Sequence, residues 1–229
     1  MLGTIVNALA VVAGTALGLV LKGGIRENYQ ETIMDAVALS VLLIGIMSAI
    51  KTNNLILLVI CMAVGSIIGE ALKIEDRLEG LGRMIESRIS RSDGGVAKAF
   101  VTASLIFCVG SMAIVGSIES GLTGNHQTLF AKSVLDGICA VFLASALGFG
   151  VIFSAAAILI YQGIITLLAS SLKSVLTAEI IREITAVGGV LIIAISLNML
   201  KIKKIKVGNM LPAIFLPFLY FFVRKLIGI

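Results

Sequence analysis

Long apolar stretches separated by short polar ones run along nearly the whole chain. Most are close to the length of about 20 residues that a helix needs to cross the hydrocarbon core of a bilayer. The pattern predicts an all-α, polytopic helix bundle that forms a single transmembrane domain over residues 1–229. It has about eight spans, at 3–21, 33–50, 55–72, 96–118, 129–147, 149–172, 184–200 and 210–223.

Residues 74–92, between the third and fourth predicted spans, follow a different pattern. Apolar residues recur there at steps of three and four, which places them on one face of a helix. Charged residues occupy the other face. This pattern predicts an amphipathic helix that lies in the membrane interface.

The composition supports a membrane protein. The chain is 59% hydrophobic and 14% charged, with a mean hydropathy of +1.11. Soluble domains are roughly half apolar and one quarter charged. The net charge of +5 fits basic loops held at the cytoplasmic face. We expect no nucleic-acid partner, because no basic and aromatic soluble surface is present.

The distribution of basic residues predicts the orientation. Most of the 18 lysine and arginine residues fall in the odd-numbered connections between spans, chiefly within 73–98 and 201–206. Such connections are normally cytoplasmic. With eight spans, both termini are then non-cytoplasmic and the amphipathic helix faces the anionic lipids of the inner leaflet. If the number of spans is wrong by one, one terminus lies on the cytoplasmic side instead.

Two apolar segments resemble each other. Residues 36–51 (AVALSVLLIGIMSAIK) and 186–201 (AVGGVLIIAISLNMLK) align without gaps at an offset of 150 residues. Residues 1–73 would then correspond to 149–229. Because an odd number of spans precedes the second copy, it enters the membrane from the opposite side, as in the inverted repeats of transporters and some channels. Chance similarity between two apolar helices stays open as the alternative.

The central spans, within 96–148, contain an unusual run at 108–124, CVGSMAIVGSIESGLTG. It holds two Gly-Ser pairs, Gly110-Ser111 and Gly116-Ser117, followed by Glu119. Such residues let a membrane helix break, and a broken helix can expose backbone groups to an ion or a substrate. The run therefore predicts a glycine-broken helix with Glu119 as a cation ligand. Close helix packing is the alternative explanation.

Asp136 is the clearest ionisable residue at membrane depth, and Lys132 precedes it by one helical turn. Intramembrane ionisable groups are costly and are usually functional. Asp136 is either an ion or substrate ligand that faces the protein interior or half of an interfacial ion pair with Lys132. The hypothetical substrate or ion site comprises Gly110, Ser111, Gly116, Ser117, Glu119 and Asp136.

Two small-xxx-small motifs occur in the first and third predicted spans. Gly14 and Gly18 form one, and Gly65 and Gly69 form the other. Helix packing is the predicted role of these motifs, and a homo-oligomer that forms through them stays open.

The sequence lacks the common motifs of catalysis and nucleotide binding. It has no Walker A motif, HExxH motif or GxSxG motif, and its single histidine makes a zinc site improbable. The three cysteines lie in apolar runs, where they act as small packing residues. We therefore expect no enzymatic activity, no metal and no cofactor.

The opening segment Gly3-Thr4-Ile5-Val6-Asn7 and the run Cys108–Ser117 resemble a bacterial family of uncharacterised membrane proteins that includes the YqgA-like and YdfK-like proteins. The resemblance covers the whole chain. It implies a multi-pass protein of the bacterial plasma membrane and brings no substrate and no catalytic residues.

These observations favour a small secondary transporter or channel for an ion or small solute. A gradient would drive it, since no nucleotide-binding motif is present. The alternative hypothesis is a non-transporting membrane scaffold or partner subunit, whose amphipathic helix docks a cytoplasmic partner.

Overall fold

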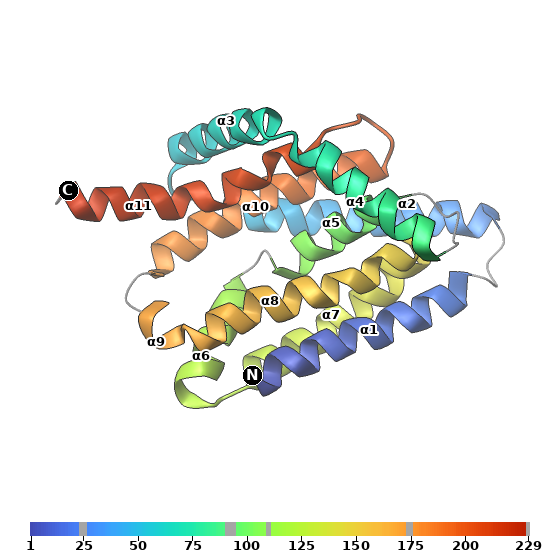
Figure 1. Cartoon of the computed structure of the whole chain (residues 1–229), viewed down its shortest axis with the longest axis horizontal. Coiled ribbons are helices and arrows are strands. Elements are labelled where there is room, and N and C mark those ends of the chain that lie inside the picture. The colour runs from blue at the N-terminus through green and yellow to red at the C-terminus, as the bar shows by residue number, and fades with distance from the viewer. Residues whose placement is uncertain (23–26, 90–94, 109–110, 173–175, 228–229) are drawn as a thin grey trace.

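The computed structural model describes residues 1–22, 27–89, 95–108, 111–172 and 176–227. These residues form helices and connecting turns, without a strand among them (Figure 1). The α-helices are α1 (Leu2–Lys22), α2 (Glu27–Ala49), α3 (Leu55–Ala71), α4 (Ile74–Ile89), α5 (Val96–Cys108), α6 (Ser111–Thr123), α7 (Gln127–Leu147), α8 (Ser154–Leu167), α9 (Ala169–Leu172), α10 (Ala178–Met199) and α11 (Leu216–Ile227). Two 3₁₀ helices, η1 (Phe149–Phe153) and η2 (Val207–Phe215), precede α8 and α11.

Five helical segments in the described part of the chain are long and apolar enough to cross a membrane: α1, α7, η1 with α8, α10, and η2 with α11. Two bent pairs raise the number to seven: α3 with the start of α4, bent by 54°, and α5 with α6, bent by 60°. The prediction of an all-helical fold with several apolar spans is confirmed for the described residues, whereas the count of eight spans stays a prediction. The second predicted span coincides with α2, whose apolar part, Asp35–Ala49, is shorter than the other spans.

The helices pack in close pairs (Figure 1). The pairs with the most extensive contact are α1 with α7, α2 with α10, and α3 with η2. A Cβ atom at Gly14 or Gly18 would collide with the carbonyl oxygen of Gly137 or Val141 on α7. Because the later glycine of α1 contacts the later residue of α7, the two helices run parallel to each other.

The second glycine motif packs α3 against η2. A Cβ atom at Gly65 would collide with the backbone of Ala213, and one at Gly69 with the backbone of Asn209. Both small-xxx-small motifs therefore contact helices of the same chain in this structure.

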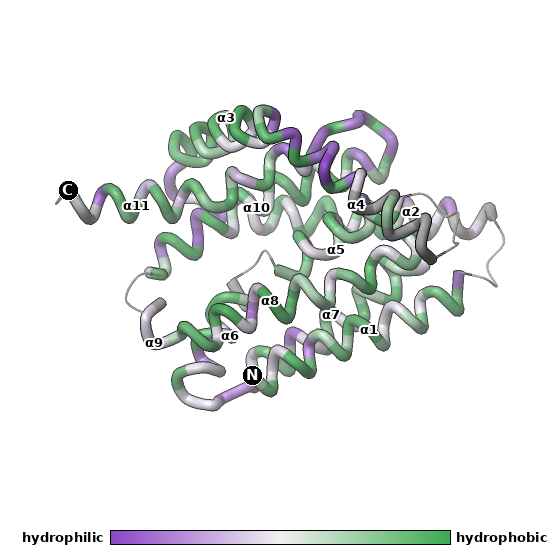
Figure 2. The backbone as a smooth tube through the Cα atoms, viewed as in Figure 1, coloured by the Kyte–Doolittle hydropathy of each residue, from purple (hydrophilic) through white to green (hydrophobic). Residues whose placement is uncertain are grey.

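Polar caps hold the turns at the ends of these helices. The Asn54 side chain accepts a hydrogen bond from the Leu57 N–H at 2.9 Å and starts α3. Asn198 exchanges two hydrogen bonds with the backbone of Ile205, at 2.7 and 2.8 Å, and so fixes the turn between α10 and η2. This turn and the start of α4 are the most hydrophilic parts of the fold in Figure 2.

The amphipathic segment forms α4, which contacts α5 and η2. Residues 90–92 of the predicted segment lie outside the described residues. Helix α5 ends at Cys108 and α6 begins at Ser111, and the two helices are bent by 60°. Residues 109–110 lie outside the described residues, so the glycine break predicted there stays a prediction. The second Gly-Ser pair, however, lies inside the continuous helix α6, so the prediction of an interruption there is wrong. Gly116 packs on Thr128 and Leu129, which shows that its small size serves close helix contact.

Candidate ion or solute site

A buried ion pair lies inside the bundle on α7. The Lys132 ammonium donates hydrogen bonds to both carboxylate oxygens of Asp136, at 2.8 and 2.7 Å. The two residues are four positions apart, so they share one face of the helix. Lys132 is 7% exposed and Asp136 6% exposed. The Lys132–Asp136 ion pair, which was the alternative to a ligand role for Asp136, does form. It is buried rather than exposed to water at the membrane interface.

The ion pair connects two helices. Asn7 of α1 donates a hydrogen bond from Nδ2 to Asp136 Oδ2 at 3.0 Å. The parallel packing of α1 on α7 brings these residues together, because Gly3 contacts Leu129 and Gly14 contacts Gly137 on either side of them. A buried amide needs hydrogen-bond partners for both of its polar atoms. Asn7 has such a partner at Nδ2.

Several other polar atoms in this part of the bundle have no hydrogen-bond partner among the described residues. They are Asn7 Oδ1, Ser117 Oγ and both side-chain polar atoms of Gln162. All three side chains are 0% exposed. Buried polar groups are almost always hydrogen-bonded, so a group of unsatisfied ones marks a place suited to an ion, a water molecule or a polar solute.

Helix register brings Gln162 to the level of Asn7. The hydroxyl oxygens of Thr4 on α1 and Thr166 on α8 are 3.5 Å apart. The two helices run in opposite directions (Figure 1). Asn7 lies one turn after Thr4, and Gln162 lies one turn before Thr166, so the two amides occupy the same level on facing helices.

The same argument places Ser117. A Cβ atom at Gly121 of α6 would collide with the carbonyl oxygen of Thr166, and α6 runs in the same direction as α8. Ser117 lies one turn before Gly121, and Gln162 lies one turn before Thr166. The two side chains are therefore at the same height along the axes of the parallel helices α6 and α8. The end of α5 is also near, since the charges of Lys132 and Asp136 reach Cys108.

We call this set of buried residues the polar centre, and it draws on α1, α6, α7 and α8. Its members are Asn7, Ser117, Lys132, Asp136 and Gln162.

Only two residues of the predicted site, Ser117 and Asp136, belong to the polar centre. Glu119 points elsewhere: its carboxylate accepts hydrogen bonds from Asn125 Nδ2 and Thr128 Oγ1, both at 2.7 Å. Thr128 precedes Asp136 by more than two turns of α7, about 12 Å along the helix axis. Glu119 therefore closes the turn between α6 and α7.

The remaining predicted site residues have other roles or are not described. Gly116 packs against the start of α7. Ser111 begins α6, but its side chain lies outside the described part of the structure, and so does the whole of Gly110.

Two buried residues were missed by the sequence reasoning. Gln162 is a single amide in an otherwise apolar run, a signal that could have identified it. Glu183 was placed just before the seventh span, but α10 begins earlier and buries it to 1% exposure. Its carboxylate accepts hydrogen bonds from Thr52 Oγ1 at 2.5 Å and the Asn53 N–H at 2.9 Å. Glu183 thus ties α10 to the turn between α2 and α3.

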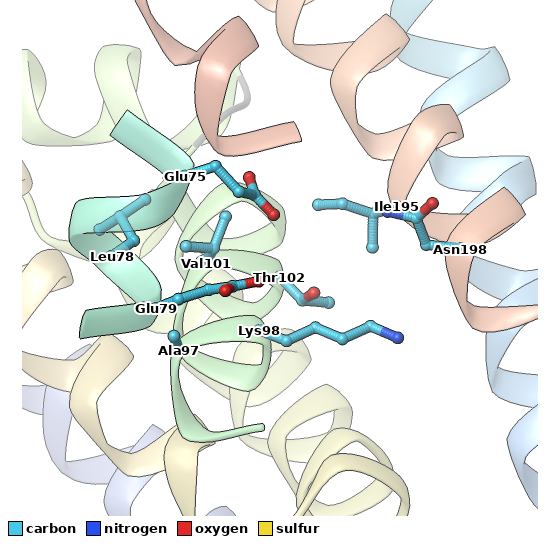
Figure 3. A pocket seen from close by; sticks show the side chains of 9 residues that line it. All are labelled: Glu75, Leu78, Glu79, Ala97, Lys98, Val101, Thr102, Ile195 and Asn198. Carbon is cyan, nitrogen blue, oxygen red and sulfur yellow. The ribbon is translucent and has the colours of Figure 1, made fainter. Parts of the chain in front are cut away.

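A small cavity lies between α4, α5 and α10, with a volume of about 50 Å³ (Figure 3). Glu75 and Glu79 line it from α4, and Lys98 extends across it toward Asn198. Burial raises the pKa of Glu75, although the Gly208 N–H donates to its carboxylate at 2.6 Å. A cavity of this size holds one or a few waters rather than an organic solute.

Two larger cavities offer few polar groups. One, of about 470 Å³, lies between α3 and α11, and another, of about 260 Å³, lies between α2, α5 and α7. Their linings are mostly apolar. Within the described residues, no cluster of three or more His, Cys, Asp or Glu side chains is arranged to hold a metal ion. The polar centre is therefore the strongest candidate site.

Sequence comparison places the chain among proteins without an assigned activity. Residues 2–222 match the family described as "Protein of unknown function (DUF554)". The chain is 34% identical to the uncharacterized membrane protein YdfK of Bacillus subtilis (strain 168), over 100% of this chain and 99% of that protein. It is 31% identical to the uncharacterized protein YqgA of Escherichia coli (strain K12), over 94% of each chain. No solved structure matches. The resemblance noted from the sequence is confirmed, and the chain belongs to the DUF554 family.

Proposed function

We propose that this protein is a small secondary transporter or channel of the bacterial inner membrane, driven by the electrochemical gradient of an ion or small solute. The polar centre is the observation that carries the proposal. A charged pair and three buried side chains that carry unsatisfied polar atoms lie between four helices of the bundle. Such groups are costly at membrane depth and generally belong to a substrate or ion pathway.

The broken helix supports the same function. The direction of the chain changes by 60° between α5 and α6, and this break lies close to the ion pair. Irregular backbone at membrane depth is tolerated where protein or a water-filled cavity surrounds it. Discontinuous helices beside a buried charge are a common way to build an ion or substrate site in transporters.

The antiparallel helix contacts expected of an inverted repeat are the second support. At the offset of 150 residues, the bounds of α2 and α10 coincide to within one residue. These helices also contact each other in antiparallel register. Ser196 Oγ donates to the Ala38 carbonyl oxygen at 2.7 Å, and Gly45 packs beside Gly189. The helices α2 and α10 cross near residues 42 and 192. These two positions are equivalent at the offset of 150 residues, as a two-fold axis between the copies would require.

The other elements of the two copies pair in the same way. Gly65 meets Ala213 and Gly69 meets Asn209, so α3 and η2 are also antiparallel. The third pair is α1 and α8, whose antiparallel contact includes Thr4 and Thr166. Antiparallel contact between every pair of corresponding elements is expected when a two-fold axis in the membrane plane relates the copies.

The proposed topology has eight spans, with α2 as a short one. Both chain ends lie at one end of the bundle, and the basic turn before η2 lies at the other (Figure 1). An even number of crossings is consistent with this arrangement. The basic turn would be cytoplasmic, and both termini would be non-cytoplasmic.

The test is transport by purified protein in liposomes, with solid-supported-membrane currents recorded for a panel of cations, anions and organic acids. We expect a current that the Asp136→Asn variant loses. The Glu119→Gln variant is the matched control, because it changes a carboxylate outside the polar centre, and it should keep the current. Folding of each variant is checked by size-exclusion chromatography.

The scaffold hypothesis makes the opposite prediction. Folded protein would give no current and no tracer flux with any solute, and a partner would co-purify in a fixed ratio. That result would overturn the transporter proposal.

A further inference from the structure

We propose that the lysines around the turn between α10 and η2 bind the phosphate headgroup of an anionic phospholipid. Four of them, Lys98, Lys201, Lys203 and Lys204, form what we call the basic cluster. Lys98 lies in the first turn of α5, whereas the ion pair of the polar centre lies near the other end of that helix. The lipid site is thus separate from the polar centre, so it goes beyond the proposed function and does not depend on it.

Two elements bring the basic cluster together. Lys98 belongs to α5, and the other lysines follow the end of α10. Asn198 connects the two elements. It exchanges hydrogen bonds with the backbone of Ile205, and it lines the small cavity across which the Lys98 side chain extends (Figure 3). The charges of Lys201 and Lys204 also reach Lys98. The fold therefore gathers ammonium groups from two elements at one surface.

The basic cluster carries positive charge that the described residues do not balance. Lys201 has an exposed partner, the Glu31 carboxylate, at 3.8 Å. Lys98, Lys203 and Lys204 form no ion pair within the described part of the chain. Lys98 also stands at the N-terminal end of α5, where the helix dipole adds positive potential. Like charges held close together repel one another, so an anion at this surface is stabilising.

The acidic residues beside the cluster do not take the place of that anion. Glu75 and Glu79 of α4 line the same cavity as Lys98. The Glu75 carboxylate accepts a hydrogen bond from the Gly208 N–H at 2.6 Å. The Lys98 side chain extends away from Glu79 and toward Asn198 (Figure 3). The carboxylates of α4 therefore leave the exposed side of the turn to an external anion.

The basic cluster lies at the level of the lipid headgroups in the proposed topology. Helix α10 ends at Met199, η2 begins at Val207 and α5 begins at Val96, and each of these ends belongs to a candidate span. The ends of spans reach the headgroup region that borders the hydrocarbon core. Lysines in that region attract anionic lipids, and each raises the affinity about fivefold. A phospholipid headgroup is therefore the anion that this position favours.

An exposed apolar side chain within the cluster favours a lipid over a soluble anion. Ile202 lies between Lys201 and Lys203 and is 68% exposed. Such a side chain is poorly accommodated in water and is stabilised among acyl chains. Basic residues that flank apolar ones are typical of segments at the surface of anionic membranes. The turn thus contacts both parts of a phospholipid, with lysines at the phosphate and Ile202 at the acyl chains.

The experiment counts the lipids bound to purified, delipidated protein in detergent by native mass spectrometry. Phosphatidylglycerol, phosphatidylcholine with the same acyl chains, glycerol 3-phosphate and poly-glutamate are titrated separately. We expect saturable binding of phosphatidylglycerol, about tenfold or more tighter than that of the other three. The affinity should fall as the concentration of ammonium acetate is raised, because salt screens exposed charges.

Four variants separate the roles of the residues. Lys98→Gln and Lys204→Gln should each weaken phosphatidylglycerol binding about fivefold, because each removes one charge at the bilayer surface. Ile202→Ser should weaken phosphatidylglycerol binding and leave the weak binding of glycerol 3-phosphate unchanged. Lys51→Gln is the matched control and should keep the wild-type affinity. Lys51 is an exposed lysine in the turn that packs on the start of α10, at the far end of that helix from the basic cluster.

Each remaining outcome overturns the lipid site. Equal affinities for phosphatidylglycerol and phosphatidylcholine would do so, and so would an unchanged affinity in Lys204→Gln. Tighter binding of glycerol 3-phosphate would assign the cluster to a free phosphate compound, and tighter binding of poly-glutamate would assign it to an acidic protein. If Lys98→Gln does not fold, Lys204→Gln decides, since its side chain is exposed. Transport by protein that does not select phosphatidylglycerol retains the proposed function and overturns this site.

Discussion

At the scale of single residues, position relative to the surrounding helices decides whether a polar side chain is available to a ligand. Glu119 and Asp136 are both acidic residues of the central spans. Glu119 is engaged by a local turn, whereas Asp136 is held between α1 and α7 by Lys132 and Asn7. Sequence could identify Asp136 because an acidic residue in a long apolar run is rare. It could not identify the partners of Glu119, which depend on how the turn folds.

Glu183 gives a residue-scale prediction about stability. Its buried carboxylate accepts two hydrogen bonds from the turn between α2 and α3. In Glu183→Gln, the amide nitrogen cannot accept a hydrogen bond, so one donor loses its partner. We expect a loss of about 1–3 kcal/mol of stability, measured by thermal unfolding in detergent. Glu179→Gln, at an exposed position of the same helix, should change little. Equal midpoints for the two variants would contradict this role of Glu183.

At the scale of elements, the helices are held by contacts between small residues. The glycine motifs were predicted as packing motifs, and their spacing is visible in the sequence. Their partners on α7 and η2 were not predictable, because they lie far away in the chain and carry no complementary pattern. Likewise, the sequence could not show that Gly116 lies inside the continuous helix α6.

The contact between α1 and α7 predicts a strong effect of one added methyl group. In Gly18→Ala, the new Cβ atom would collide with the carbonyl oxygen of Val141, so the helices must separate. We expect a destabilisation of about 1–3 kcal/mol, seen as a lower unfolding midpoint. Gly80→Ala in α4 is the control, because a Cβ atom there has no neighbour within 4 Å, and alanine favours helix by up to about 1 kcal/mol. A neutral Gly18→Ala would refute the close contact.

The junction of α4 with η2 predicts a dependence of stability on pH. Burial raises the pKa of Glu75 above its value in the unfolded chain. The folded state therefore holds this proton more tightly, and the contribution of Glu75 to stability falls as the pH rises through the window between the two pKa values. Glu75→Gln should remove that fall, measured as the unfolding midpoint from about pH 4 upward, where free carboxyls titrate. Asp76→Asn, at an exposed neighbour, should keep the wild-type profile. An unchanged profile in Glu75→Gln would be inconsistent with this assignment.

At the scale of the whole molecule, the lengths and order of the apolar stretches predicted the helical bundle well. The boundaries were less accurate where polar residues are buried by distant elements. The seventh predicted span began after Glu183, yet α10 starts at Ala178 because the turn between α2 and α3 satisfies that carboxylate. One aligned pair of segments led to the proposal of a repeat, while the antiparallel contacts of α2 with α10 and of α3 with η2 needed the three-dimensional arrangement.

The proposed inverted topology predicts that equivalent residues lie on opposite sides of the membrane. Lys51 and Lys201 are both exposed and are equivalent at the offset of 150 residues. In a chain whose native cysteines are replaced by alanine, Lys51→Cys should react with a membrane-impermeant maleimide added to intact cells. Lys201→Cys should react only after permeabilisation. Labelling of both residues from the same side would rule out the inverted repeat.

The most direct test of the central claim is a flux measurement on the purified protein in liposomes. The liposomes receive an external jump of one solute at a time from a panel of cations, anions and organic acids, while tracer uptake and solid-supported-membrane current are recorded. The account predicts flux of at least one of these solutes. The flux should be absent in Asp136→Asn and retained in Glu119→Gln. Folded protein that gives neither current nor tracer flux with any solute, or an equal response in Asp136→Asn, would contradict transport through the polar centre.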